Sequence, residues 1–196
     1  MSEINEPLFA RIENGQIVEY PVTTEQIRNR KAPLSMFKQV SFIDPKPQVT
    51  EFQHLKENVI LVNGVVKVTY NVTDMTLQEI LNRLHQDHEA KSSDPITVAN
   101  VPQEVFDRVV FLARKKVGED LDVFANTRDY DGIVSLCSYS TDPDPAHAAE
   151  AQRGVELRSQ AWASIRDYQM AVATGATPVP RFESEIFAIV PALTWD

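Results

Sequence analysis

Short apolar runs in the first 75 residues alternate with polar positions, and this pattern predicts two β-hairpins. Each pair of runs flanks an Asn-Gly dipeptide, Asn14-Gly15 in the first hairpin and Asn63-Gly64 in the second. Asn-Gly is a strong hairpin signal because both central residues of a type I′ turn need a positive φ. The predicted strands are Leu8–Ile12 with Ile17–Tyr20, and Val59–Val62 with Val65–Val72. We expect Pro21 to end the strand before it.

The last predicted strand has the pattern of a half-buried β-strand. Its apolar positions Val66, Val68 and Tyr70 fall on one face, while Lys67 and Thr69 fall on the other. The segment between the two hairpins, residues 30–58, contains three prolines. Proline cannot donate a hydrogen bond to a sheet, so we expect irregular or edge structure there.

Helix signals follow each hairpin. Thr23 or Thr24 is expected to cap a turn or short helix that ends near Arg28. Thr76-Leu-Gln-Glu79 is a capping box. The apolar residues after it fall on one helical stripe, namely Leu77, Ile80, Leu81 and Leu84.

A polar segment closed by proline, Lys91-Ser-Ser-Asp-Pro95, is the predicted linker. The period of the apolar residues is mainly helical beyond it. The sequence therefore predicts an α+β protein. A small N-terminal β-hairpin domain with a closing helix is expected over residues 1–90, and an antiparallel helical C-terminal module over residues 96–196.

Two helices are predicted before a break at Asp142-Pro-Asp-Pro145. Pro102 suits the first turn of a helix that extends to about Lys116, and Gly118 is expected to end it. The second helix is predicted at about Val123–Ser138.

After the break, Asp144 is the predicted N-cap of the longest helix. This helix is expected to run from about Ala146 to Thr174, with Gly175 as its C-terminal stop. A last short helix is predicted from Phe182 to about Ile189.

The composition is that of an ordinary globular protein. The 196 residues are 43% hydrophobic and 24% charged, with a net charge of −9. Binding to a phosphate backbone requires clustered Lys and Arg, so nucleic acid is not an expected partner. There is no signal-peptide pattern and no apolar run near the roughly 18 residues of a membrane span. We expect a soluble protein that is made in a cytoplasm and does not bind membranes.

The candidates for chemistry are few. Cys137 is the single cysteine and lies in an apolar run, which favours a buried core residue. The alternative, a nucleophile, would have only His147 nearby in sequence. No phosphate loop, Gly-x-Ser-x-Gly or His-Glu-x-x-His motif is present. We therefore expect no enzyme activity and no cofactor.

Two clusters raise the question of a metal. His85 and His88 are three residues apart and would share a helix face, but a site needs a further ligand, so a polar surface is favoured. A second group of acids lacks the spacing of a calcium loop. Asp129 and Asp131 in that group are expected to pair with Arg128 or Arg166. The group consists of Asp129, Asp131, Asp142 and Asp144.

Five apolar or aromatic residues are the candidates for binding a protein partner. Two hairpins make only small sheets, so we expect the first 75 residues to complete their core by association. Their contacts could be with another copy, a fibre protein or the helical module. Trp162 and Trp195 can be read as core residues or as interface anchors. The candidates are Val66, Val68, Tyr70, Trp162 and Trp195.

The C-terminal half carries a string that resembles a known module. It begins with Tyr130-Asp-Gly-Ile-Val-Ser-Leu-Cys-Ser-Tyr139 and continues through Thr177-Pro-Val-Pro180 to Ile189-Val-Pro-Ala-Leu-Thr-Trp195. This order, over roughly residues 104–196, resembles the C-terminal module of accessory tail proteins of tailed bacteriophages. Ser140 replaces the usual alanine, and Glu156-Leu157-Arg158 stands where Trp-Arg is common.

The resemblance implies a non-enzymatic component of a phage tail, at the baseplate or tail-fibre attachment region. Its partners would be other tail proteins, with a homo-oligomer possible, and its place would be the virion tail. The module also occurs in tail-fibre assembly chaperones, which is the first alternative. A metal-dependent enzyme that uses His85 and His88 is a remote second alternative.

Overall fold

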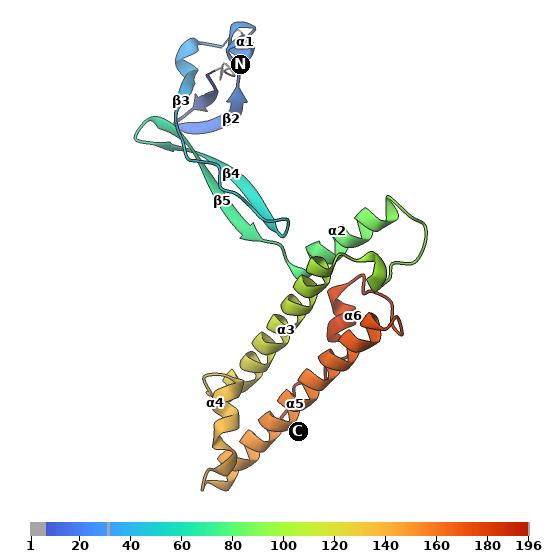
Figure 1. The fold of residues 1–196 in the computed structure, drawn as a ribbon. Coiled ribbons are helices and arrows are strands. Elements are labelled where there is room, and N and C mark those ends of the chain that lie inside the picture. Colours follow the sequence, from blue (N-terminus) through green and yellow to red (C-terminus); the bar gives the residue numbers. More distant parts are fainter. Residues whose placement is uncertain (1–6, 31, 196) are drawn as a thin grey trace. The chain divides into compact units, whose positions relative to one another are not determined.

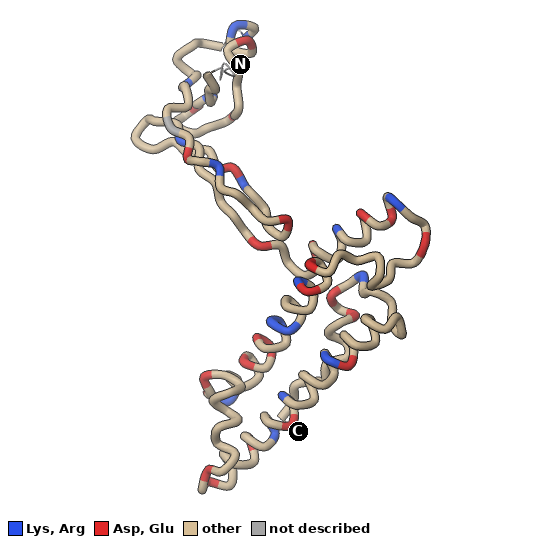
Figure 2. The backbone as a smooth tube through the Cα atoms, in the orientation of Figure 1, with Lys and Arg blue, Asp and Glu red and all other residues tan. Residues whose placement is uncertain are grey.

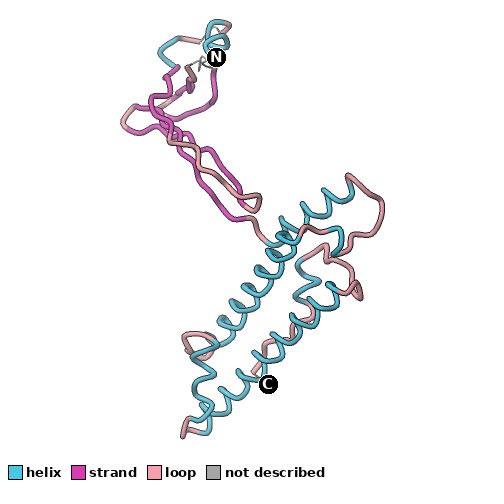
Figure 3. Tube along the Cα trace, viewed as in Figure 1, coloured by secondary structure: helices cyan, strands magenta, loops and turns pink. Residues whose placement is uncertain are grey.

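The computed structural model describes residues 7–30 and 32–195 and has an α+β fold. Its contacts divide the chain into two compact units, residues 1–75 and 76–196, which we call the sheet unit and the helical unit. Strands lie in the first unit and long helices in the second (Figure 3). The division falls before the helix that follows Thr76, not at Lys91–Pro95 as the sequence suggested. The reason is that this helix packs on other helices.

The sheet unit contains one five-stranded sheet of order β2-β1-β3-β5-β4. Both predicted hairpins are confirmed as antiparallel pairs, β1 with β2 and β4 with β5. Asn14 and Gly15 have φ values of 51° and 77°, and Asn63 and Gly64 have 52° and 76°, as a type I′ turn requires. The strands are β1 Phe9–Glu13, β2 Gln16–Val22, β3 Phe37–Ile43, β4 Gln53–Val62 and β5 Val65–Asp74.

Two expectations for this sheet were wrong. Residues 30–58 are not merely irregular or edge structure, because β3 lies in the middle of the sheet, antiparallel to β1 and parallel to β5. Pro21 does not end its strand, because β2 continues to Val22. Since β2 is an edge strand, the missing N–H of proline costs no ladder hydrogen bond there.

The core of the sheet unit is small. The sheet curls so that its edge strands β2 and β4 contact each other. The short helix α1, Thr24–Arg28, is capped by Thr23 and contributes Ile27. Among the described residues of this unit, five hydrophobic side chains are buried, namely Ala10, Val22, Ile27, Val66 and Val68.

The helical unit is built on two long helices, α3 and α5, which run in opposite directions (Figure 1). The short helix α4 contacts both of them, while α2 and α6 contact α3 and each other. The helices are α2 Leu77–Glu89, α3 Gln103–Asn126, α4 Ile133–Ser138, α5 Pro145–Ala173 and α6 Glu183–Phe187. None of the helices within the described residues is long and apolar enough to cross a membrane.

The predicted N-caps Thr76 and Asp144 are confirmed, but the predicted helix end at Gly118 and the predicted helix start at Val123 are wrong. Thr76 caps α2 in a capping box with Glu79. The Asp144 carboxylate accepts a hydrogen bond from the Ala146 N–H at 2.8 Å and caps α5. Gly118 does not end its helix, because buried residues on the same stripe carry α3 on to Asn126. The single helix expected at Val123–Ser138 is therefore split between α3 and α4.

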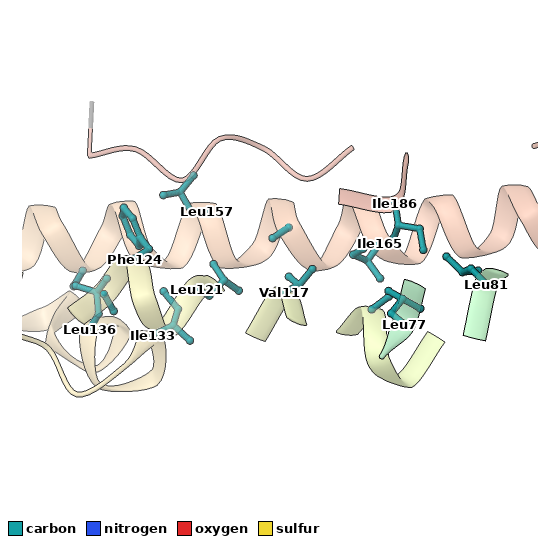
Figure 4. Packing of buried hydrophobic residues seen from close by; sticks show 14 residues of the cluster. Leu77, Leu81, Val117, Leu121, Phe124, Ile133, Leu136, Leu157, Ile165 and Ile186 are labelled. Carbon is teal, nitrogen blue, oxygen red and sulfur yellow. The ribbon is translucent and has the colours of Figure 1, made fainter. Parts of the chain in front are cut away.

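One hydrophobic core joins all five helices of this unit (Figure 4). Leu121, Leu136 and Leu157 come from α3, α4 and α5, and each is at most 1% exposed. Leu77 and Leu81 of α2 and Ile186 of α6 belong to the same cluster. The core therefore depends on α2, which explains why the division of the chain lies before this helix.

Candidate functional site

The first part of the string noted in the sequence, Tyr130–Tyr139, lies where α3, α4 and α5 meet, and we call residues 122–154 around it the corner. The N-terminus of α4 is fixed by a side chain of α3: the Ile133 N–H donates a hydrogen bond to Asp122 Oδ1 at 2.8 Å. A Cβ atom on Gly132 would lie 2.7 Å from that same oxygen. Glycine therefore allows the close approach of α3 and α4 at this point.

A second glycine sets the distance between α4 and α5. A Cβ atom on Gly154 would lie 2.6 Å from Cδ2 and 2.8 Å from Cγ of Leu136, which is fully buried. Cys137 lies beside this contact and is partly buried. Burial raises the pKa of the Cys137 thiol, an effect that Arg158 partly opposes. The raised pKa keeps the side chain a neutral thiol and disfavours the nucleophilic role.

Glu150 of α5 ties the α3–α4 connection to the long helix. Its carboxylate accepts hydrogen bonds from Arg128 Nη1 at 2.6 Å and from the Tyr130 hydroxyl at 2.9 Å. Burial, followed by the bond to Glu150, raises the pKa of Tyr130 to about 12. The Tyr130 ring meets that of Tyr139 edge-on, with centroids 5.5 Å apart. Tyr130 and Tyr139, the first and last residues of the Tyr130–Tyr139 stretch, are thus in contact.

Trp195 lies against the end of α3. Its indole ring stacks on Phe124 with centroids 4.1 Å apart and planes at 22°. The indole Nε1–H donates a hydrogen bond to Thr127 Oγ1 at 2.8 Å. The Arg128 guanidinium lies over the ring, 5.1 Å from its centroid. The last described residue of the chain is therefore held by a stack, a hydrogen bond and a cation–π contact.

Residues 189–195 form neither a helix nor a strand, and we call them the C-terminal segment. Arg153 of α5 donates from Nε to the Thr194 carbonyl at 3.0 Å. Ile189, Val190 and Leu193 pack against the core cluster. A cavity of about 220 Å³ lies next to the segment, lined by Val117, Asp120, Phe187, Val190, Pro191 and Leu193.

The five candidate partner-binding residues belong to two different units, Val66, Val68 and Tyr70 to the sheet unit and Trp162 and Trp195 to the helical unit. Val66 and Val68 are 0% and 1% exposed, so their side chains belong to the core of the sheet unit. Tyr70 is partly buried on the same strand. Trp162 and Trp195 are partly buried and pack against the core of the helical unit. While the sheet unit is folded, a protein partner would have to contact side chains other than Val66 and Val68.

The two histidines considered for a metal have other neighbours. The expectation of a polar surface was wrong for His85, which is only 8% exposed, and its Nε2 lies 3.0 Å from the Pro180 carbonyl. Nε2 of His88 lies 2.8 Å from the Asp94 carbonyl. In both pairs the ring N–H is the donor, because a carbonyl can only accept. Each histidine thus attaches α2 to a loop of its own unit.

The acidic residues of the corner also take structural roles. Asp142 accepts a hydrogen bond from the Asp144 N–H at 2.8 Å, and Asp144 caps α5. The expectation that Arg128 pairs with Asp129 or Asp131 was wrong, because its partner is Glu150. Arg166 pairs with Asp167. Across the described residues, no three His, Cys, Asp or Glu side chains gather as metal ligands would.

Most of the residues that build the corner carry no signal in the sequence. Asp122, Arg128, Glu150 and Arg153 act on partners that are distant in the chain, and nothing in their local pattern marks them. Tyr130, Gly132, Tyr139 and Trp195 stand out because they belong to the quoted string, whereas Gly154 does not. The polar groups of the corner are paired with one another, so this arrangement joins helices and shapes a surface.

No family model matches this chain, and no match is found among curated proteins or solved structures.

Proposed function

We propose that this protein is a structural component of a bacteriophage tail, located at the baseplate or tail-fibre attachment region of the virion. It is made in the host cytoplasm and acts through contacts with other tail proteins. In this proposal the sheet unit is a small hairpin-based attachment domain. The helical unit that follows it is the antiparallel module that the sequence resembles.

The observation that carries the proposal is the way in which the string assembles. Tyr130 and Tyr139 meet edge-on, Gly132 admits Asp122, and Trp195 is held by Phe124, Thr127 and Arg128. Tyr130, Tyr139 and Trp195, which belong to the quoted string, each take part in packing or hydrogen bonding here. This supports reading the resemblance as a shared way of building a helical module.

The surface of the sheet unit supports a role in binding proteins. Among the described side chains of this unit, seven large hydrophobic ones are more than a third exposed, including Leu34 at 74% and Ile43 at 52%. Val62 and Val65, which flank the Asn63-Gly64 turn, are 40% and 38% exposed. Exposed apolar side chains of this kind are typical of surfaces that bind other proteins.

Mass spectrometry of purified virions tests the proposal. A structural component should be present in a fixed ratio to the other tail proteins. Crosslinks should join the sheet unit, for example through Lys38 or Lys56, to a neighbouring tail protein. Absence from intact virions would contradict the structural role.

The same experiment separates the assembly-chaperone alternative. A chaperone would be found in the lysate but not in purified virions, and fibres would fail to trimerise without it. Metal analysis of the pure protein tests the remaining enzyme alternative at His85 and His88.

A further inference from the structure

The C-terminal segment is attached to the helical unit mainly through side chains. Among the described residues, the hydrogen bonds to its backbone are few. The Val190 N–H bonds to Phe187, the Thr194 N–H bonds to Ala192, and the Thr194 carbonyl accepts from Arg153. The first two of these are local, so they would persist if the segment left the surface. Its attachment therefore rests on Arg153, the Trp195 contacts and the packing of apolar side chains.

The surface under Trp195 is suited to a tryptophan in particular. Phe124 offers a flat face, Thr127 offers an acceptor at 2.8 Å, and Arg128 offers a cation. Phenylalanine could stack on Phe124 but could not donate to Thr127, because it has no ring N–H. The three groups belong to the last turn of α3 and the residues just after it, so they form one continuous site.

The middle of the segment is less well packed than its end. The cavity of about 220 Å³ is lined by Val190, Pro191 and Leu193 on one side and by Val117, Asp120 and Phe187 on the other. Side chains that border a cavity lose dispersion contacts on that side. The segment is thus fixed at Trp195 and borders a hollow before it.

We propose that this surface is an exchangeable peptide site, and that the C-terminal segment of a second copy of the chain occupies it when copies are brought together. The occupant follows from the structure, because a peptide of that sequence is already bound there. Every copy carries the same segment and the same Phe124, Thr127 and Arg128. Exchange of an identical element between copies creates few new contacts and is a low-cost route to a dimer.

In a single chain the protein's own segment has the advantage. It is tethered to α6 through Ala188, so its effective concentration at the site is of the order of millimolar. A free copy at lower concentration cannot compete with it. Exchange is therefore expected only at high local concentration, as in a multi-copy assembly, or when the protein's own tryptophan is removed. The inference concerns self-association and holds whether or not the protein belongs to a phage tail.

A labelled peptide with the sequence of residues 187–196 tests the site on the full-length protein. We expect it to bind the Trp195→Ala protein at least about tenfold more tightly than the unaltered protein, whose own segment blocks the site. A control peptide with alanine at position 195 should bind neither protein. Equal weak binding to both proteins would overturn the proposal. A loss of helix content in the Trp195→Ala protein would also overturn it, because the segment would then be an inseparable part of the core.

A mixing experiment tests whether the occupant can be a second copy. The Trp195→Ala protein keeps the site but lacks a working segment. A Thr127→Val, Arg128→Ala protein keeps the segment but has a damaged site, and both changed side chains are exposed. Each protein alone should sediment as a monomer, whereas the mixture should form a heterodimer with one repaired site. A mixture that stays monomeric at high concentration would overturn the proposal.

Discussion

The two units bury apolar surface to very different extents. Among the described residues, the sheet unit buries five hydrophobic side chains, whereas the helical unit buries eighteen. Yet in each unit seven of the large hydrophobic residues that the structure describes are exposed, although the sheet unit is much the smaller. Burying a Val, Leu or Ile side chain contributes about 1.5–3 kcal/mol. The helical unit therefore has a core that can sustain it, and we expect the sheet unit to rely more on contacts outside itself.

The two units also differ in net charge. Residues 1–75 contain eight basic and nine acidic side chains, and residues 76–196 contain eleven and nineteen. The net charges are thus −1 and −8. In the helical unit acidic and basic positions are interspersed along the helices (Figure 2). A nearly neutral unit with exposed apolar residues is prone to associate, whereas strong net charge favours solubility.

The largest expected effect comes from moving the start of the helical unit. A chain that begins at residue 76 should fold with its full helix content, because α2 supplies Leu77, Ile80 and Leu81 to the buried residues. A chain that begins at residue 96 lacks these three side chains and should be less stable by about 5 kcal/mol. Urea unfolding of both fragments measures the difference. Equal stability would place the boundary at residues 91–95, as the sequence suggested.

A single core substitution should have the next largest effect. Leu121 is 0% exposed in the core of the helical unit, so Leu121→Ala should lower the free energy of unfolding by about 2–5 kcal/mol. Val123 lies two residues away on α3 and is 63% exposed. As the matched control, Val123→Ala should change stability by less than about 0.5 kcal/mol. Similar losses in the two variants would mean that this core does not dominate stability.

Local signals allowed much of this fold to be predicted. Asn14-Gly15 and Asn63-Gly64 impose their turns whatever surrounds them, and Thr76 and Asp144 cap helices through bonds within three residues. Strand β3 could not be predicted in this way, because its apolar residues do not alternate regularly and its partners β1 and β5 are distant in sequence. Gly118 was misread for a related reason: burial of Leu121 and Phe124 outweighs the intrinsic cost of one helical glycine.

The candidate site was less predictable than the fold. The string pointed to this region of the chain, but the side chains that hold Trp195 come from the end of α3 and the residues just after it. The hydrogen bond between Trp195 and Thr127 joins residues 68 positions apart. The alternation of apolar and polar residues predicted a buried face at Val66 and Val68. Such a face can belong either to the core of a unit or to an interface with a partner. Only the folded sheet shows that these two side chains belong to a core.

Two glycines in long helices provide a smaller, matched test of the packing in the corner. Gly154→Ala places a Cβ atom 2.6 Å from the buried Leu136 side chain and should destabilise the helical unit by about 1–3 kcal/mol. Gly118→Ala meets no heavy atom within 4 Å and should stabilise α3 by about 0.5–1 kcal/mol. Thermal unfolding followed by circular dichroism gives both values. Stabilisation by both substitutions would contradict the close contact between α4 and α5.

The smallest expected effect is a change in stability at alkaline pH. The pKa of Tyr130 is raised from 10.0 to about 12, first by burial and then by its hydrogen bond to Glu150. The folded state holds this proton more tightly than the unfolded state. The contribution to stability is therefore complete below about pH 10 and is lost as the pH rises towards 12.

Tyr130→Phe tests this effect in the helical unit. The substitution removes the titrating group, so stability should fall less steeply between pH 10 and 12 than in the unaltered protein. At neutral pH the lost hydrogen bond should cost about 0.5–1.5 kcal/mol. Tyr20 of the sheet unit, whose pKa is also raised to about 12, remains as an internal reference. An unchanged pH profile would show that Tyr130 is not held in the folded state as described.

Amide hydrogen exchange on the intact, isolated protein compares the two units most directly. Exchange rates report the local free energy of opening for each segment. The account predicts that amides around Leu121 and Leu157 exchange at least about tenfold more slowly than those around Val66 and Val68. If the proposed function holds, adding a tail protein that binds this chain should slow exchange mainly in the sheet unit. Equal protection of both units in the isolated protein would contradict the claim that the sheet unit depends on contacts beyond itself.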